Sequence, residues 1–300
     1  MTRPVLVVAF NPAVDVEWTV DRVVPGEKNE IVAERRWPGG KGINVARWLK
    51  WLGCPARLFL PAGGDTGREL LDGLRRERIG VETFPIRQAT RANVVVTPRT
   101  GSQLRFNPAW PVLTPPEVRR MLAGLRRAMD DAAAVVLSGS LARGMAPDTY
   151  AGLVREAGRR GRPVFLDADG EAFRRGAEAG PFLVKPNDYE LAQWAGAAID
   201  AGPALAAAAR RLQQVTRGWV MVSRGPAGAW LLGPDPGREL SRPARRVRVR
   251  NTVGAGDAML AGVVDAVRRD APPACWLAAG LAVAAQAVRL PGGQVPPRGA

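Results

Sequence analysis

The 300-residue sequence contains no histidine, only two cysteines and no long hydrophobic run. A pair of cysteines, Cys54 and Cys275, excludes a small disulfide-held fold and indicates reduced thiols. The first apolar run, Val5–Phe10, is too short for a signal peptide, and the longest, Trp276–Val288, is shorter than the roughly 20 residues of a membrane span. We therefore expect a cytoplasmic protein without a membrane segment.

Acidic residues are scarce as well, with 28 against 43 basic ones and a net charge of +15. Only four of the basic residues are lysines, and the arginines are spread along the chain in pairs such as Arg75-Arg76 and Arg119-Arg120. A nucleic-acid-binding surface more often concentrates its charge in one stripe. Diffuse arginine with abundant Ala, Gly and Pro indicates composition bias, so we expect no nucleic-acid partner and an anionic small substrate instead.

The apolar fraction of 46% excludes disorder over most of the chain. β-Branched runs alternate with Ala-, Leu- and Arg-rich helical runs, which predicts a doubly wound α/β domain with a mostly parallel sheet flanked by helices. The expected strands are Pro4–Phe10, Ala56–Pro61, Ala134–Leu137, Pro163–Asp167, Phe182–Lys185, Trp219–Ser223 and Ala229–Leu232. The expected helices are Ile43–Leu52, Gly67–Arg78, Pro115–Asp131, Pro147–Arg160, Glu190–Trp194, Gly202–Val215, Ala258–Arg268 and Ala274–Val288.

Two segments interrupt this alternation. Asp15–Trp37 and Arg91–Phe106 are extended in pattern, rich in charges and turn residues, and without helical periodicity. We expect them to pair into a small separate sheet beside the site. The expected organisation is a core of residues 1–10, 38–90 and 107–290, lid segments 11–37 and 91–106, and a frayed, flexible Gly/Pro-rich tail at 291–300.

The most informative motif is Asn251-Thr252-Val253-Gly254-Ala255-Gly256-Asp257, between an expected strand at Arg246–Arg250 and an apolar helix. Glycines before a helix let the backbone amides of residues 254–257 converge on one point, which is suited to a phosphoryl group. A carboxylate there repels phosphate unless it accepts a proton from an incoming hydroxyl, which is the role we expect for Asp257. The alternative is that Asp257 merely caps the helix.

Two other nucleotide-binding motifs do not fit. A dinucleotide fingerprint requires a third glycine where Met259 stands, and it belongs in the first strand-helix-strand unit of the domain. A Walker loop requires Gly-Lys followed by Ser or Thr, but Gly42 follows Lys41. Neither motif is supported by the sequence.

A second glycine motif, Pro38-Gly39-Gly40-Lys41-Gly42-Ile43-Asn44, also opens an amphipathic helix. Its glycines allow the backbone to approach a ligand closely, and Asn44 can both donate and accept hydrogen bonds to sugar hydroxyls. A plain glycine-rich turn is the alternative.

A third motif, Lys185-Pro186-Asn187-Asp188-Tyr189-Glu190, stands at an expected strand end, where α/β sheets bind ligands. Asn187 and Glu190 face the same side of a helix start and are candidates to hold hydrated Mg²⁺ through water, with Lys185 meeting phosphate. The alternative is a helix start at which Asn187 is the N-cap and Glu190 its capping-box partner.

Together these motifs resemble the PfkB/ribokinase family of carbohydrate kinases. The Gly39–Ala46 and Thr252–Asp257 segments resemble its two signatures, and the similarity extends over nearly the whole chain. Further matching segments are Asn11-Pro12-Ala13-Val14-Asp15, Thr90-Arg91-Ala92-Asn93, Ser138-Gly139-Ser140-Leu141 and Ser223-Arg224-Gly225-Pro226-Ala227-Gly228.

The resemblance implies a doubly wound domain with a small β lid that is often used to form a homodimer. It also implies ATP and Mg²⁺, with Asp257 as the base and the amides of Gly254, Ala255, Gly256 and Asp257 stabilising the transferring phosphoryl group. By the same resemblance the sugar is held by Asp15, Gly39, Gly40, Lys41, Asn44, Asn93 and Ser140. The nucleotide side is lined by Lys185, Asn187, Ser223, Arg224, Gly225, Gly228 and Thr252.

The choice of substrate depends on cations for a second phosphate. Lys28, Arg91 and Arg105 lie in or beside the expected lid, and their patterns resemble the phosphofructokinase branch of the family. We expect a sugar phosphate, with fructose 6-phosphate first and fructose 1-phosphate or tagatose 6-phosphate as alternatives. Arg224 and the pair Ala168-Asp169 depart from the family pattern, with no consequence that the sequence reveals.

Three other functions stay open at this point. A ribose or nucleoside kinase of the same superfamily would make the three lid cations incidental. A sugar or nucleotide sensor without activity would have no use for Asp257 beside phosphate. A nucleic-acid-binding protein is supported by the net charge alone, and salt-sensitive DNA binding without ATP turnover would favour it.

Overall fold

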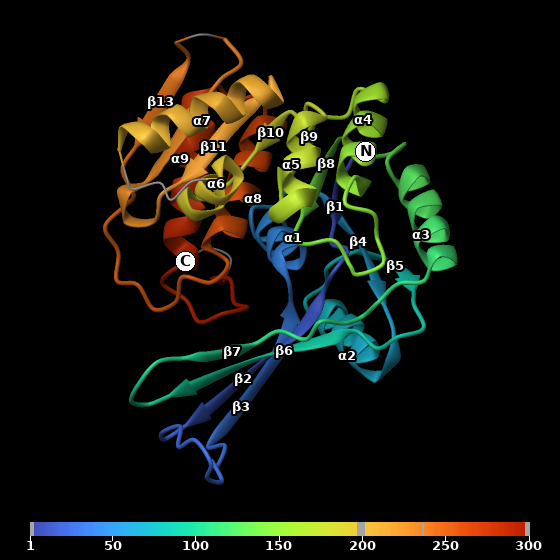
Figure 1. The fold of residues 1–300 in the computed structure, drawn as a ribbon, viewed down its shortest axis with the longest axis vertical. Coiled ribbons are helices and arrows are strands. Elements are labelled where there is room, and N and C mark those ends of the chain that lie inside the picture. The colour runs from blue at the N-terminus through green and yellow to red at the C-terminus, as the bar shows by residue number, and fades with distance from the viewer. Residues whose placement is uncertain (1–2, 197–201, 236, 298–300) are drawn as a thin grey trace.

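A computed structural model describes residues 3–196, 202–235 and 237–297 and contains two sheets (Figure 1). The small sheet has the order β3 (Ala33–Gly39), β2 (Ala13–Val20), β6 (Arg91–Pro98) and β7 (Leu104–Phe106). The large sheet has the order β13 (Glu239–Arg242), β12 (Ala229–Leu232), β11 (Trp219–Ser223), β10 (Leu183–Val184), β9 (Val164–Asp167), β8 (Ala134–Ser138), β1 (Val5–Val8), β4 (Ala56–Ala62) and β5 (Val81–Pro85).

The helices of the described segments lie on the two faces of the large sheet. They are α1 (Lys41–Trp51), α2 (Gly64–Arg76), α3 (Pro115–Ala128), α4 (Thr149–Arg159), α5 (Gly170–Glu178), α6 (Asp188–Ala195), α7 (Pro203–Thr216), α8 (Ala255–Arg268) and α9 (Pro273–Ala287), with a 3₁₀ turn at Gly225–Ala227. The doubly wound, mostly parallel architecture expected from the sequence is confirmed.

Strand β1 shows why the sheet is covered on both sides. Its four residues are fully buried, and alternate side chains of a strand point to opposite faces. Val5 and Val7 therefore pack in one core with α1, α2, α8 and α9, and Leu6 and Val8 pack in a second core with α3 to α7. A continuous apolar run is the sequence pattern that this arrangement requires.

The strand order changes direction at β1, and this locates the site. From β1 the chain adds β4 and β5 on one side and then β8 to β11 on the other, all parallel. Ligands of open α/β sheets bind beyond the carboxyl ends of the strands near such a switch. Asp167 ends β9 and Lys185 follows β10, so both lie at that edge of the sheet.

The small sheet is formed by the two segments that break the strand-helix alternation. β2 pairs in parallel with β6 and antiparallel with β3, and β7 pairs with β6. One face of this sheet is apolar and packs near α2, where Val14 and Val16 are buried. The other face carries polar residues, among them Asp15 opposite Asn93. We call this sheet the lid; it projects from the α/β domain (Figure 1).

The expected strand at Arg246–Arg250 is wrong. The last strand of the sheet is Glu239–Arg242, and residues 243–250 are not in a strand. Pro243 has no N–H to continue the ladder, and the arginines that follow it are exposed to solvent. The chain therefore reaches the Thr252–Asp257 signature as an extended loop.

Besides β13, which pairs with β12, two elements were not expected from the sequence. The short edge strand β5 contains only five partly exposed residues. The helix α5 contains Gly170 and Gly176, which lower helix propensity. At Gly176 an added Cβ would lie 2.8 Å from the Leu166 side chain, so a larger residue there would require the packing to shift.

The final described segment, residues 291–297, lies against the lid. The carbonyl oxygen of Gly292 accepts a hydrogen bond from the Arg35 guanidinium at 3.1 Å, and the Trp37 ring lies against Gly293. The expected flexibility of this tail stays a prediction, since the last three residues fall outside the described part. In the segments that are described, none of the helices is both apolar enough and long enough to cross a membrane.

Candidate active site

The two glycine motifs meet at a hydrogen bond between Asn44 and Asp257. Asn44 Nδ2 donates to Asp257 Oδ2 at 2.8 Å, although the residues are far apart in sequence. Asp257 is 5% exposed and lies in the first turn of α8, whose N-cap is Gly254 with φ of 81°. The N-cap is Gly254 rather than Asp257, and the hydrogen bond of the Asp257 side chain in the described chain comes from Asn44, so the helix-cap alternative is wrong.

The start of α8 presents free backbone donors next to this carboxylate. In the described part of the chain, the amides of Gly256 and Asp257 have no hydrogen-bond acceptor, whereas the Ala255 amide donates to Thr252 O at 3.3 Å. Unpaired amides at a helix N-terminus attract anions. The left-handed backbone of Gly254 makes this turn, because a residue with a Cβ would be strained at that φ.

Beside Asp257 lies a cluster of two lysines and two carboxylates. Lys41 Nζ is 3.1 Å from both Asp167 Oδ1 and Glu190 Oε1, and Lys185 Nζ is 3.0 Å from Asp167 Oδ2. The Lys185 ammonium also lies against Gly256, where a Cβ would be 3.2 Å away. Lys41, expected at the sugar, thus lies among residues expected at the nucleotide.

Charge coupling sets the protonation of this cluster. Burial opposes ionisation of Asp167, but Lys185 and Lys41 outweigh it and lower its pKa. Burial likewise opposes the charge on Lys41, but Asp167 and Glu190 outweigh it and raise its pKa. Lys41 therefore remains a cation that can face phosphate at neutral pH.

The pKa of Asp257 is shifted in the opposite direction to that of Asp167. Burial, followed by the negative charge of Asp167, raises its pKa to about 6, while the Asn44 hydrogen bond and the lysines Lys41 and Lys185 act to lower it. A carboxylate with a pKa near the working pH is suited to accept a proton during a reaction and release it afterwards.

The polar face of the lid supplies the second half of the site. Asn93 Nδ2 donates to Asp15 Oδ1 at 2.8 Å, and a Cβ at Gly39 would overlap the Asp15 carboxyl group. Burial raises the pKa of Asp15. The Arg91 guanidinium donates to Asn11 O at 3.1 Å, beside the pair formed by the Asn11 amide and the Ser140 hydroxyl.

Strand register assigns Arg105 to the same lid face and leaves Lys28 apart. Arg105 lies opposite Val95, two residues after Asn93, so its side chain shares the face of Asn93 and Asp15. Lys28 is in the exposed connection between β2 and β3, which lies at the end of the lid far from the core (Figure 1). Within one chain, the structure does not bring Lys28 to the other two cations.

The expected nucleotide side contains both structural and candidate binding residues. Asn187 Oδ1 accepts from the Glu190 amide at 2.7 Å while Glu190 Oε2 accepts from the Asn187 amide at 2.9 Å, so the capping box is confirmed. Residues Asn187 and Ser223 form a bridge between neighbouring chain segments. Gly225 and Gly228 have positive φ, and the Arg224 guanidinium stacks 4.0 Å above the Trp230 ring.

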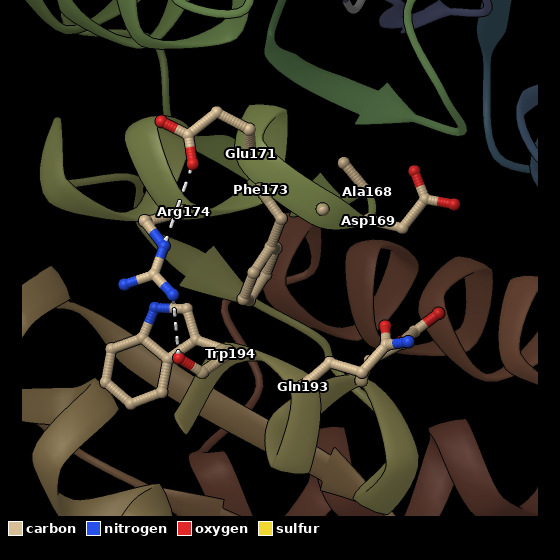
Figure 2. Close-up of a pocket in the computed structure, with 9 residues that line it drawn as sticks. Ala168, Asp169, Glu171, Phe173, Arg174, Gln193 and Trp194 are labelled. Carbon is tan, nitrogen blue, oxygen red and sulfur yellow. Dashed lines mark hydrogen bonds and ion pairs between the residues drawn. The ribbon is translucent and has the colours of Figure 1, made fainter. Parts of the chain in front are cut away.

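A cavity of about 210 Å³ lies between α5 and α6 (Figure 2). One of its lining residues is Glu190, which also pairs with Lys41 in the cluster of two lysines and two carboxylates. Phe173 and Trp194 form its apolar part. Arg174 crosses its edge, pairing with Glu171 at 3.7 Å and donating to Trp194 O at 3.1 Å. The side chains of Asp257 and Asn44 do not line it.

Comparison with known proteins decides the family. The sequence matches the family described as pfkB family carbohydrate kinase over residues 6–298. The chain belongs to this family. It is 38% identical over 271 residues to ATP-dependent 6-phosphofructokinase isozyme 2 of Mycobacterium tuberculosis. The aligned region covers 88% of this chain and 78% of that protein. It is 31% identical over 265 residues to 1-phosphofructokinase of Vibrio cholerae, with 88% and 82% covered.

A solved structure agrees with these relatives. The carbohydrate kinase superposes on phosphofructokinase-2 from Escherichia coli in complex with fructose-6-phosphate with a TM-score of 0.86, at 28% identity, covering 96% of this chain and 94% of that one. The protein is thus an ATP-dependent sugar kinase, and the resemblance seen in its motifs is confirmed.

Two side chains of the kinase site were missed in the sequence. Asp167 was expected only as a strand end, yet its buried carboxylate joins Lys41 to Lys185. Arg47 was not expected to take part, although it lies three residues after Asn44 on α1, a spacing that places both on one helix face. The position of Asp167 at the carboxyl end of a central strand was the signal available for it.

Proposed function

We propose that the kinase transfers the γ-phosphoryl group of ATP to a hydroxyl of a sugar phosphate, with fructose 6-phosphate as the substrate and fructose 1,6-bisphosphate as the product. Fructose 1-phosphate and tagatose 6-phosphate are the alternatives. The observation that carries the proposal is the buried Asp257 carboxylate, held by Asn44 beside the free amides at the start of α8.

Each group has a defined task in this reaction. Asp257 accepts the proton of the attacking hydroxyl, which is a poor nucleophile at neutral pH. The amides of Gly256 and Asp257 stabilise charge on the transferring phosphoryl group, and the Lys41 and Lys185 ammonium groups compensate the charge of the donor phosphates. The protein's contribution is alignment and charge compensation.

We also propose that Mg²⁺ accompanies ATP. Carboxylate oxygens of Asp167 and Glu190 converge on the Lys41 ammonium, so this part of the site is built for cations. Mg²⁺ is commonly held by one or two carboxylates, water and phosphate oxygens. Asn187 and Glu190 would hold the ion through water, although Asn187 Oδ1 is already bonded to an amide. When bound, the ion neutralises phosphate charge.

The sugar-phosphate assignment rests on cations at the lid. Arg91 and Arg105 share the lid face that carries the Asp15–Asn93 pair. Hydroxyls suit the Asp15 and Asn93 side chains, and a remote phosphate suits the two guanidinium groups. A free sugar would leave these arginines without a partner from the substrate.

A coupled ADP-release assay tests the proposal with fructose 6-phosphate, fructose 1-phosphate, tagatose 6-phosphate, ribose and fructose. We expect the highest kcat/KM with fructose 6-phosphate and little turnover of the two free sugars. Preferred turnover of ribose or fructose would contradict the proposed role of the lid arginines.

The pH dependence of the reaction follows from Asp257. Its pKa is raised to about 6, so the carboxylate is ionised above that pH and becomes protonated below it. Only the ionised form accepts a proton, and we therefore expect kcat/KM to fall about tenfold per pH unit below about pH 6. A profile measured between about pH 5 and pH 9 checks this. A profile flat down to pH 5 would contradict the assignment of the base.

Removal of the lid cations is expected to affect the sugar phosphate selectively. Arg105→Ala should raise KM for the sugar phosphate about tenfold and leave KM for ATP unchanged, because one charge-assisted contact is lost. Arg99→Ala is the control, since this lid arginine pairs with Asp21 at the surface. Equal, modest changes in both KM values would contradict the phosphate contact.

We propose in addition that two chains form a homodimer through the lid, in the cytoplasm. Support comes from the apolar lid face, which leaves Leu104 40% and Phe106 56% exposed beyond α2. Exposed apolar patches of this kind indicate protein interfaces.

The dimer proposal is tested by sedimentation velocity. We expect the wild type to sediment as a dimer and Phe106→Ser to sediment as a monomer. Trp110→Ser is the matched control, because it removes an aromatic side chain of similar exposure (54%) outside the lid strands. A monomeric wild type at micromolar concentration would exclude the interface.

A further inference from the structure

Arg47 is buried in the kinase core with every branch of its side chain bonded. Only 5% of the residue is exposed. Its Nε and Nη2 donate to the two carboxylate oxygens of Glu77 at 2.7 and 2.9 Å, and Nη2 also donates to Pro38 O at 2.8 Å. Its Nη1 donates to Asn44 Oδ1 at 2.9 Å. Among the contacts of the described residues, Asn44 is the link between Arg47 and the groups that face Asp257, and the Arg47 charge also acts to lower the pKa of Asp15.

These contacts determine which way the Asn44 amide faces. A guanidinium can only donate hydrogen bonds, so the Asn44 atom that faces Arg47 must be the oxygen. The Asn44 nitrogen then necessarily faces Asp257 and donates to its Oδ2 at 2.8 Å. Without Arg47 the two ends of the amide, which are nearly equal in size, could exchange places.

The anchor of Arg47 lies outside the site. Glu77 is the C-cap residue of α2, and both of its carboxylate oxygens accept hydrogen bonds from the guanidinium in a bidentate pair. Pro38 O belongs to the strand end that leads into the Gly39-Gly40 turn. One side chain thus ties α1, α2 and the glycine turn together behind Asp257.

We propose that Arg47 is a positioning residue that fixes the Asn44 amide with its N–H toward the Asp257 carboxylate, so that the base is held ionised and correctly aimed. The proposal rests on the proposed function only in treating Asp257 as the proton acceptor. Glu77 holds the Arg47 guanidinium in place and therefore takes part in the same positioning.

The electrostatics around Asp257 explain why this orientation matters. Asp167 at the end of β9 favours the protonated acid, while Lys41 from α1 and Lys185 after β10 favour the carboxylate. The Asn44 N–H also favours the carboxylate. A turned amide would present its oxygen instead, and that oxygen can only accept a hydrogen bond from the protonated acid.

The first test measures the pKa of Asp257 in the absence of substrate. Carbon-13 NMR of aspartate-labelled protein follows its carboxyl titration, with the signal assigned by its loss in Asp257→Asn. We expect Arg47→Lys to move the Asp257 pKa from about 6 to about 7, because one ammonium cannot serve Glu77, Pro38 and Asn44 together. Arg210→Met is the control, since Arg210 forms a similar bidentate pair with Glu239 at the surface.

The second test separates positioning from general support of the fold. Arg47→Lys should lower kcat about tenfold with KM for ATP unchanged. In an Asn44→Ala background the same change should have no further effect on kcat or on the Asp257 titration, because the amide through which Arg47 acts is gone. A merely structural role would give effects that multiply in the double variant.

The outcomes are decisive in each case. An unchanged Asp257 titration in Arg47→Lys, or the full Arg47→Lys effect in the Asn44→Ala background, would overturn the proposal. If Arg47→Lys does not fold, Glu77→Gln decides, since it weakens the anchor and should shift the titration in the same direction. If the wild type phosphorylates none of the sugars, the proposed function fails, but the NMR titrations still test the coupling of Arg47 to Asp257.

Discussion

Asp257→Asn is expected to lower kcat by about a thousandfold while ATP binding stays close to that of the wild type. Asparagine keeps the shape of the side chain and can still accept the Asn44 hydrogen bond, but it cannot take a proton from the hydroxyl. The Lys41–Asp167–Lys185 cluster and the amides at the start of α8 do not depend on it. Steady-state kinetics and ATP titration measure the two quantities separately.

A second measurement on the same variant addresses stability. The pKa of Asp257 is raised in the folded state, so the stability it contributes is complete below its unfolded pKa, near 3.8, and is lost as pH rises through about 6. At pH 8 the buried charge disfavours folding, and Asp257→Asn should unfold at a higher temperature than the wild type. The wild type would then be more active but less stable than Asp257→Asn, as is common at sites where function opposes stability.

Asp130→Asn is the matched control for both measurements. Asp130 makes a 2.8 Å pair with Arg160, and its side chain is 62% exposed, away from the site. We expect wild-type kinetics and a nearly unchanged unfolding temperature. Retention of near-normal kcat by Asp257→Asn would contradict the base assignment and with it the proposed mechanism.

Gly39→Ala is expected to lower kcat/KM for the sugar phosphate about a hundredfold with KM for ATP unchanged. The added Cβ would overlap the Asp15 carboxyl group, which would have to move and break its 2.8 Å hydrogen bond from Asn93. Small displacements of groups that hold a substrate can have effects of this size on the reaction. Kinetics with each substrate varied in turn provide the measurement.

Gly152→Ala makes the same chemical change at a place without contacts. Apart from the backbone of α4 itself, no heavy atom of the described residues lies within 4 Å of a Cβ at this position, so kinetics should be unaffected and the helix slightly more stable. Circular dichroism confirms the folding of both variants. Wild-type kcat/KM in Gly39→Ala would show that Asp15 does not hold the sugar.

Most of the fold follows from local sequence patterns. The buried run Val5–Phe10, the glycine-led helices and the two extended insertions each predict their element because the pattern and the structure share a period. The strand expected at Arg246–Arg250 is wrong because Val and Arg alternate there without a neighbouring strand to pair with. Strand β5 and helix α5 were missed because short elements carry weak patterns.

The sequence motifs predicted the chemistry of the site but not every contact between its residues. The Asn187–Glu190 spacing allowed both a capping box and a metal site, and the structure confirms the capping box without testing the metal site. Lys41 was assigned to the sugar, yet its ammonium lies between Asp167 and Glu190. Roles at the ligand, including those of Lys28 and Ser140, stay predictions.

The sequence by itself determined the class of fold, the two glycine turns, Asp257 as the candidate base and membership of a sugar kinase family. Only the tertiary structure decided that Asn44 faces Asp257, that Asp167 joins two lysines and that Arg47 fixes the Asn44 amide. The physical reason is that glycine turns and strand periods are set by neighbouring residues. Hydrogen bonds and charge coupling between α1, β9 and α8 arise only when packing brings distant segments together.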